Sequence, residues 1–225
     1  MQWPVEGPFL RDQLLRLPGT EKPSAIDKQL AMGEVWLNLN GLQGDRVADH
    51  RFHGGPDRSL CHYPAEHYSH WRKLYPQLSA IGPAAFGENL STLGLDERQV
   101  CIGDRFRWGD AVIEVSQPRS PCSNLDRRHS VRGLARHMAK SGRTGWLYRT
   151  LEPGAIELGA DLHLIEHPWP TVSVLRVWRG FINDDVNDIE LAWLANLSPL
   201  ASEYRTRFRQ RLDSRRRQQD QAALF

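Results

Sequence analysis

The chain has 225 residues, of which 40% are hydrophobic and 25% charged, and its formal net charge at pH 7 is +2. This composition is that of an ordinary globular protein, and it excludes the collagen-like and intrinsically disordered classes. A net charge this close to zero gives little long-range attraction for nucleic acid or for an anionic membrane.

The sequence also argues against a membrane or secreted protein. No stretch approaches the roughly 18 apolar residues that span a bilayer. The first ten residues carry Glu6 and two prolines in place of the apolar core of a signal peptide. The three cysteines are an odd number in a chain large enough to fold without disulfides. We therefore expect a cytoplasmic protein with reduced thiols and no membrane partner.

The first elements can be predicted from local pattern. A strand is predicted over residues 34–40, where apolar and polar residues alternate up to an Asn-Gly turn. A helix is predicted over residues 64–75, because Pro64 suits a first helical turn and Pro76 stops the pattern.

Residues 100–117 are predicted to form antiparallel β-structure, because two Gly-Asp pairs divide them into short apolar segments. Short strands without alternating helices of similar length favour a sandwich or barrel over a doubly wound parallel sheet. A second helix is predicted over residues 130–140, with Ser130 as its N-cap and Gly142 just past its end. The main domain should therefore be mostly β with helices.

The segment His167-Pro168-Trp169-Pro170 fits neither a strand ladder nor a helix, and apolar residues recur at helical spacing after it. We predict a main domain over residues 1–168 and a helical extension over residues 169–225. Its three short helices span fewer than about 50 residues, so they should pack on each other and on a partner surface. Their predicted apolar stripes are Val174, Val177, Trp178 and Phe181; Ile189, Ala192, Trp193 and Leu197; and Tyr204, Phe208 and Leu212.

The sharpest chemical signal is the segment Ser116-Gln117-Pro118-Arg119-Ser120-Pro121-Cys122, which holds a cysteine in a loop stiffened by two prolines. The positive charge of Arg119 would favour the thiolate of Cys122, the form that attacks electrophiles and binds metals. Burial of Cys122 as a small apolar residue is the competing interpretation. Cys61 and Cys101 lie in apolar, strand-like segments, where packing is the simpler explanation.

The segment His53-Gly54-Gly55-Pro56-Asp57-Arg58 places two glycines between a histidine and an arginine. Its backbone N–H groups could form an anion-binding nest, although Gly-Gly-Pro is also a plain turn signal. The sequence contains no H-E-x-x-H, G-x-S-x-G, Walker A or strand-linked G-x-G-x-x-G motif. The commonest zinc hydrolases, serine hydrolases and nucleotide-binding proteins are therefore disfavoured.

Six segments, taken together and in this order, resemble the MOSC family and within it the YiiM-like branch. They are Lys22-Pro-Ser-Ala-Ile26, Gly41-Leu-Gln-Gly-Asp45, His53-Gly-Gly-Pro-Asp-Arg58, Phe86-Gly-Glu-Asn-Leu90, Ile102-Gly-Asp104 and Pro118-Arg-Ser-Pro-Cys122. Each is a modest signal, whereas their joint order is specific. The resemblance implies an α+β fold, a MOSC-type β-barrel followed by a small C-terminal three-helix extension.

The same resemblance implies that the chain binds the molybdenum cofactor, molybdopterin, and reduces N-hydroxylated compounds such as N-hydroxylated purine bases. Cys122 falls on the family's metal-binding cysteine, and a soft thiolate suits molybdenum. The electrons would come from an external reductase, because the sequence has no flavin, haem or iron–sulfur motif. The cofactor contacts that the resemblance implies are Lys22, Ser24, Asn89 and Arg119. It also implies that a loop containing His53, Gly54, Gly55 and Arg58 lines the site. These loop residues could bind the cofactor, bind the substrate or maintain the shape of the loop.

Two other functions remain open. A fixed, reactive thiol at Cys122 also suits a sulfur carrier that forms a persulfide. Seven arginines between Arg205 and Arg217 would suit nucleic acid, although a solvated helix face is favoured because Tyr204 and Phe208 fall on the apolar stripe. The expected partners are a small N-hydroxylated substrate and an external electron-donor reductase. The choice between a monomer and a homodimer is left open.

Overall fold

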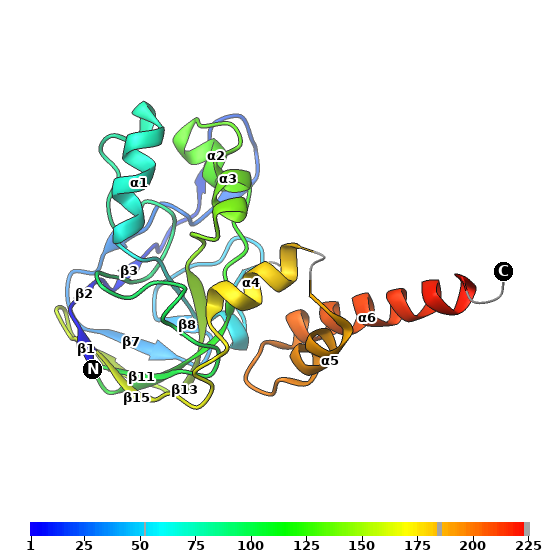
Figure 1. The fold of residues 1–225 in the computed structure, drawn as a ribbon. Coiled ribbons are helices and arrows are strands. Elements are labelled where there is room, and N and C mark those ends of the chain that lie inside the picture. The colour runs from blue at the N-terminus through cyan, green and yellow to red at the C-terminus, as the bar shows by residue number, and fades with distance from the viewer. Residues whose placement is uncertain (52, 184–185, 223–225) are drawn as a thin grey trace.

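The computed structural model describes residues 1–51, 53–183 and 186–222 (Figure 1). Its centre is a curled antiparallel sheet of six strands in the order β1-β15-β11-β12-β13-β9. These strands are β1 (Gln2–Trp3), β15 (Leu162–Glu166), β11 (Arg105–Trp108), β12 (Ala111–Pro118), β13 (Trp146–Glu152) and β9 (Leu60–His62).

Smaller sheets complete the half-barrel. One has three strands, β14 (Gly154–Ile156), β7 (Val35–Asn38) and β8 (Gly41–Leu42). The others are two-stranded ribbons, which pair β10 (Ser91–Thr92) with β2 (Val5–Glu6), β3 (Phe9–Leu10) with β6 (Gln29–Leu30), and β4 (Leu15–Arg16) with β5 (Pro23–Ser24).

The helices form two groups (Figure 1). The first group packs on one end of the barrel and comprises α1 (Glu66–Leu74), α2 (Asn124–His129) and α3 (Leu134–Ser141). The second group follows the barrel and comprises α4 (Val174–Ile182), α5 (Asp188–Asn196) and α6 (Ser202–Ala222). Two short 3-10 turns cover Pro56–Arg58 and Pro76–Leu78. The predicted α+β fold, a β-barrel with a C-terminal three-helix extension, is confirmed.

The hairpin predicted within residues 100–117 is present as β11 and β12, and its register pairs Trp108 with Ala111 across the turn. Gly109 has a φ of +59°, and a Cβ there would lie 2.4 Å from the carbonyl oxygen of Ala155. Only glycine fits this turn without displacing the backbone. The start of the region is not a strand, because Cys101 pairs only through an isolated bridge to Ser173 in the extension.

The predicted N-cap at Ser130 is wrong. Ser130 has a φ of +53° and closes α2, a helix that the sequence pattern did not predict. The next helix, α3, begins at Leu134, and the carboxylate of Asp126 accepts hydrogen bonds from the N–H groups of Gly133 (2.6 Å) and Ala135 (2.8 Å). A carboxylate from the preceding helix thus supplies the cap, which a search for an adjacent capping residue misses.

Two hydrophobic cores hold the molecule together. The larger core lies inside the half-barrel and continues into the extension, whose buried Leu194, Tyr204 and Phe208 belong to it. The smaller core joins α1, α2 and α3 through the large side chains Tyr63, Tyr68, Trp71, Phe86, Leu125, Leu134 and Met138. The extension therefore shares its core with the barrel, and the boundary predicted between residues 168 and 169 stays a prediction.

The face predicted for α5 is only partly correct, because Leu197 is buried in the core and Ala192 packs against it, whereas Ile189 and Trp193 do not lie in the core. Ile189 is 83% exposed and Trp193 is 36% exposed, whereas Leu191 and Leu194 are fully buried. Apolar residues lie all around this helix, so the sequence pattern does not specify which side faces the core.

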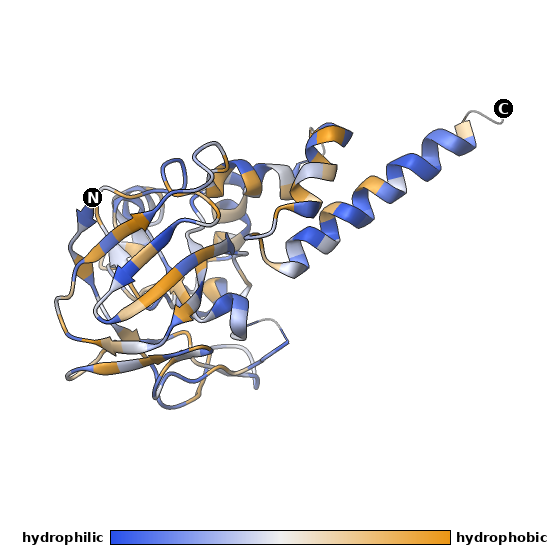
Figure 2. Cartoon of the chain, turned by 90° about the horizontal axis from the view of Figure 1, so that it is seen from below, coloured by the Kyte–Doolittle hydropathy of each residue, from blue (hydrophilic) through white to orange (hydrophobic). Residues whose placement is uncertain are grey.

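The last helix, α6, is longer than predicted. It extends away from the barrel (Figure 1), and most of its residues are hydrophilic (Figure 2). Three arginines in the middle of this helix are not simply solvated. Arg209 donates to the carbonyl of Ala195, Arg211 to that of Gly180 and Arg215 to that of Val186. They thus fasten α6 to α4, α5 and the chain between them. Within the described residues, no helix is both long and apolar enough to cross a membrane.

Burial of a neutral histidine makes the stability of the fold depend on pH. His62 is fully buried, and its ring nitrogens lie 3.0 Å from the hydroxyl of Tyr148 and 2.9 Å from that of Thr92. Burial lowers the pKa of His62 to about 3. Below the unfolded pKa of about 6.5, the unfolded chain binds a proton that the folded chain does not, so stability falls as the pH falls.

We predict that His62 makes the free energy of unfolding fall by about 1.4 kcal/mol per pH unit between pH ~6 and pH ~4. Urea denaturation at successive pH values measures this slope. His62→Gln should remove this contribution to the slope, and His163→Gln, at an exposed position on β15, should retain it. Equal slopes for the wild type and His62→Gln would contradict the prediction.

Candidate functional site

A cavity of about 860 Å³ lies between the barrel loops and the start of α6. This volume is in the range of pockets that enclose a small ligand or cofactor. The residues singled out in the sequence line its wall, with the exception of Gly55: Lys22, Ser24, His53, Gly54, Arg58, Asn89, Arg119 and Cys122. The fold thus brings together segments that are far apart in the chain.

Cys122 is half-buried on this wall, in the turn between β12 and α2. The segment before it is anchored from two sides. The N–H of Arg119 donates to the carbonyl of Gly145 at 3.1 Å, and the hydroxyl of Tyr204 donates to the carbonyl of Pro118 at 3.1 Å. Because Gly145 precedes β13 and Tyr204 belongs to α6, both the barrel and the extension position the thiol.

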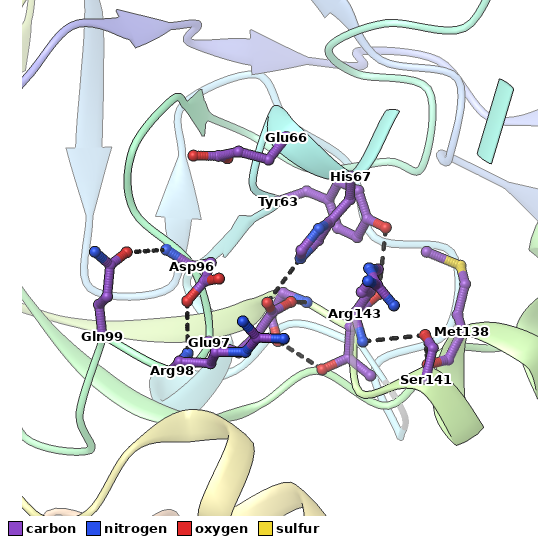
Figure 3. A network of polar contacts seen from close by, with 12 residues as sticks. Tyr63, Glu66, His67, Asp96, Glu97, Arg98, Gln99, Met138, Ser141 and Arg143 are labelled. Atoms are coloured by element: carbon purple, nitrogen blue, oxygen red, sulfur yellow. Dashed lines mark hydrogen bonds and ion pairs between the residues drawn. The ribbon is translucent and has the colours of Figure 1, made fainter. Parts of the chain in front are cut away.

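Gly145 is held in turn by a buried polar network, of which Figure 3 shows Glu97 and His67. Glu97, only 3% exposed, accepts from the N–H of Gly145 at 2.7 Å and lies 2.7 Å from Nε2 of His67 on α1. Gly145 has a φ of +71°, and a Cβ there would lie 2.2 Å from the carbonyl oxygen of His62. Only glycine fits at this position. The network therefore connects α1 to the backbone that orients Arg119.

The guanidinium of Arg119 is only partly satisfied by the protein. Its Nη2 donates to the carbonyl of Phe86. That loop is held by the fully buried Glu88, which accepts from the N–H groups of Ala84 (2.6 Å) and Phe86 (3.0 Å) and from the hydroxyl of Tyr68. The Nη1 atom of Arg119 is buried and has no hydrogen-bond partner among the described residues. A fixed arginine with unused donors thus stands on the cavity wall.

Gln117 provides a second unsatisfied polar group on the wall. This residue lies near the end of β12, is 3% exposed and lines the cavity. Its Oε1 atom is buried without a hydrogen-bond partner in the part of the chain that the structure describes. A buried amide oxygen left unpaired costs about 1–3 kcal/mol, and a donor on a bound ligand would remove this cost.

Asn89 lines the cavity, but its carboxamide is bonded within the protein. Its Nδ2 donates to the carbonyl of Phe9 (3.0 Å) and to the carboxylate of Asp45 (2.9 Å). Its Oδ1 accepts from the N–H of Cys61 at 3.0 Å. Asp45 also pairs with Lys28. Asn89 therefore joins three segments, of which those containing Asp45 and Cys61 line the cavity.

Residues 53–58 form a turn. Gly54 and Gly55 have φ values of +71° and +92°, and the N–H of Arg58 donates to the carbonyl of Gly55 at 2.9 Å. Both φ values are positive, which favours glycine at each position, and Gly55, with a ψ of 172°, lies outside the left-handed helical region. Anion binding by this loop stays a prediction. The guanidinium of Arg58 pairs with Glu203 of α6. The loop therefore helps to join the barrel to the extension at the cavity.

Two of the expected cofactor contacts, Lys22 and Ser24, lie at the ribbon that β5 forms with β4. Lys22 is exposed and precedes β5, so its ammonium group is accessible to a ligand. Ser24 is 4% exposed, and its hydroxyl accepts from the N–H of Ile26 at 3.3 Å. Its O–H proton is left for a group in the cavity.

The cavity is electropositive. Burial lowers the pKa of His53, and the charges of Arg119 and Arg58 lower it further. Among the described lining residues, basic side chains outnumber carboxylates: Lys22, Lys28, Arg46, Arg51, Arg58, Arg119, Arg127 and Arg207 against Asp45, Asp49 and Glu203. Such a wall suits an anionic ligand.

Residues 49–163, more than half of the chain, match the model of the MOSC domain. The chain belongs to the MOSC domain family. It is 50% identical to protein YiiM of Escherichia coli (strain K12) over 145 residues. These residues make up 64% of this chain and 65% of YiiM. It is 39% identical to a protein named reductase from Gibberella moniliformis (strain M3125 / FGSC 7600) over 163 residues. These residues make up 72% of this chain and 29% of that protein.

The crystal structure of YiiM from Escherichia coli resembles this MOSC protein along nearly its whole length. The match has a TM-score of 0.77 at 34% identity and covers 95% of this chain and 94% of that chain. The sequence matches span less than two thirds of YiiM and less than one third of the fungal protein. The resemblance to the YiiM-like branch is confirmed.

Two residues of this MOSC cavity were not identified as candidates from the sequence. Cys61 was assigned to packing, yet it is half-buried on the cavity wall. Burial raises the pKa of its thiol, whereas Arg119 lowers it. Cys101, by contrast, is buried as expected. Gln117 was identified only as part of the Cys122 segment; the available signal was a polar side chain near the end of a strand that begins with an apolar run.

We predict that Gln117→Met leaves the free energy of unfolding of the ligand-free protein unchanged or raises it by about 1 kcal/mol, because an unpaired buried oxygen is removed at nearly constant volume. Urea denaturation measures the effect. The matched control is Ser116→Ala. The hydroxyl of Ser116 donates to the carbonyl of Asp57 at 2.6 Å, and loss of this bond should lower the free energy of unfolding by about 1 kcal/mol. A larger loss in Gln117→Met than in Ser116→Ala would show that Gln117 is a structural residue.

Proposed function

We propose that this protein is a molybdenum-cofactor-dependent oxidoreductase that reduces N-hydroxylated compounds, such as N-hydroxylated purine bases, with electrons from an external reductase. One observation carries the proposal: the thiol-bearing Cys122 lies on the wall of an electropositive cavity of about 860 Å³. The similarity to a fungal protein named reductase supports oxidoreductase chemistry.

The cavity wall fits such a cofactor in charge and in hydrogen bonding. The molybdenum cofactor is an anionic pterin dithiolene that carries a phosphate, so cationic side chains should bind it. Lys22 and Arg119 are suited to the phosphate and to pterin oxygens. The unpaired atoms of Arg119 and Gln117 offer a donor and an acceptor to the edge of a heterocycle.

The protein's own residues would bind and orient the reactants. When bound, the cofactor supplies the two electrons that cleave the N–O bond of the substrate. The thiolate of Cys122 would ligate the metal, because soft sulfur ligands suit it. The anchored backbone around Pro118 and Arg119 would hold that sulfur in place. His53 and Cys61 lie on the same wall, where they would face the substrate or the cofactor.

We predict that the protein purified from a host that makes the cofactor contains near-stoichiometric molybdenum and pterin and reduces an N-hydroxylated purine base with a reduced viologen as donor. Cys122→Ala should lower both the molybdenum content and the rate. The loss should exceed the ~10–100-fold cost of removing an outer-shell partner of a metal, because a direct ligand is lost.

The control is the wild-type protein from a host that cannot make the cofactor, which should be folded and inactive. Substoichiometric molybdenum in the competent host, together with an unchanged rate for Cys122→Ala, would contradict the proposal.

A sulfur carrier is the second candidate, because Cys61 and Cys122 line one cavity and two thiols suit persulfide exchange. Intact-mass measurement separates the two functions. A labile extra sulfur on Cys122 without bound pterin would favour the carrier, and pterin fluorescence after oxidation would favour the reductase.

A further inference from the structure

Three side chains of metal-ligand type meet outside the cavity. Cys101 and Asp104 lie in the turn that precedes β11, and His167 directly follows β15. One ligand atom of each residue lies within 4.8 Å of those of the other two. The three residues are therefore neighbours in space, although His167 is far from the other two in sequence.

This cluster is buried on one side and open on the other. Cys101 and Asp104 are each 2% exposed. The side chain of His167 is 39% exposed, so a small ion can reach the cluster from solvent without passing through the core.

The cluster is short of positive charge. The carboxylate of Asp104 accepts from the N–H of Cys101 at 2.8 Å and lies 2.6 Å from Nδ1 of His167. Nearby Arg105 is engaged by Glu114 and Glu166. A buried carboxylate beside a buried thiol favours a cation.

We propose that Cys101, Asp104 and His167 bind one zinc ion, with a water molecule as the fourth ligand. Sulfur, imidazole nitrogen and carboxylate oxygen are the ligand types of protein zinc sites. A tetrahedral site with Zn–ligand bonds of about 2.0–2.3 Å needs ligand atoms about 3.5 Å apart. The widest separation, within 4.8 Å, would contract by about 1 Å, and the 2.6 Å contact between Asp104 and His167 would open by about 1 Å.

The charge of the site balances when zinc binds. The Cys101 thiol releases its proton to solvent and binds as thiolate, Asp104 binds as carboxylate, and His167 binds as neutral imidazole. Two negative ligands neutralise Zn²⁺, so the buried complex carries no net charge. No electron transfer is involved.

The position of the site connects it to the architecture of the chain. His167 begins the segment that leads into α4, and the N–H of Ile102 donates to the carbonyl of Val172 at 2.9 Å beside the cluster. Zinc at this point would clamp the extension to the barrel. Because the ion would bind the folded chain, it should also raise the melting temperature.

The test is titration of the metal-free full-length protein with Zn²⁺ against a chromophoric chelator, and with Co²⁺ as a spectroscopic probe. We expect one zinc per chain and a thiolate-to-cobalt charge-transfer band in the near ultraviolet. Cys101→Ser should abolish the band, and Cys101→Ser and His167→Ala should each weaken zinc binding on the order of 100-fold.

Matched controls separate this site from the cavity. Cys122→Ser removes the cavity thiol, and His163→Ala removes an exposed histidine of β15; both should bind zinc like the wild type. The proposal is overturned if Cys122→Ser abolishes the band, or if His167→Ala binds zinc as tightly as the wild type. The His167→Ala variant decides the question even if Cys101→Ser does not fold, because the His167 side chain is 39% exposed and its removal leaves the core intact.

Discussion

Two hydrogen bonds hold the backbone that leaves β12, and they determine where Cys122 stands. One runs from the N–H of Arg119 to Gly145, and the other from the hydroxyl of Tyr204 to Pro118. Gly145, which accepts the first bond, is held by the buried Glu97 network. Tyr204, which donates the second, is packed in the larger core. The position of the thiol therefore depends on the barrel, on α1 and on the extension together.

The cavity around Cys122 combines unpaired polar atoms with an excess of positive charge. Nearly every buried polar atom in a protein interior is bonded, and of the few unpaired ones among the described residues, those of Arg119 and Gln117 lie on the cavity wall. Other wall residues are already engaged, as the bonds of Asn89 show. This division separates side chains that build the wall from those that are available to a ligand.

The extension is part of the site because it completes the cavity wall. Its helix α6 contributes Tyr204 and Arg207 to the wall, and Glu203 pairs with Arg58 of the barrel. Arg211 and Arg215 donate to carbonyls around the end of α4 and fasten the helix that carries these groups. Helix α6 therefore packs in the barrel core and at the same time supplies side chains to the cavity wall.

The sequence by itself determined the features that depend on neighbouring residues. Glycine-aspartate turns specified the hairpin of β11 and β12, Pro76 ended α1, and two prolines stiffened the approach to Cys122. Recognition of the ordered motifs identified the family and most of the cavity wall. These signals are readable because turn geometry and proline sterics act within a few residues.

Only the tertiary structure decided what distant partners control. The capping of α3 by Asp126, the buried face of α5 and the placement of Cys61 on the cavity wall depend on which surfaces meet. The meeting of His167 with Cys101 and Asp104 is of the same kind. Burial and long-range hydrogen bonds are properties of the packed molecule, and no local pattern specifies them.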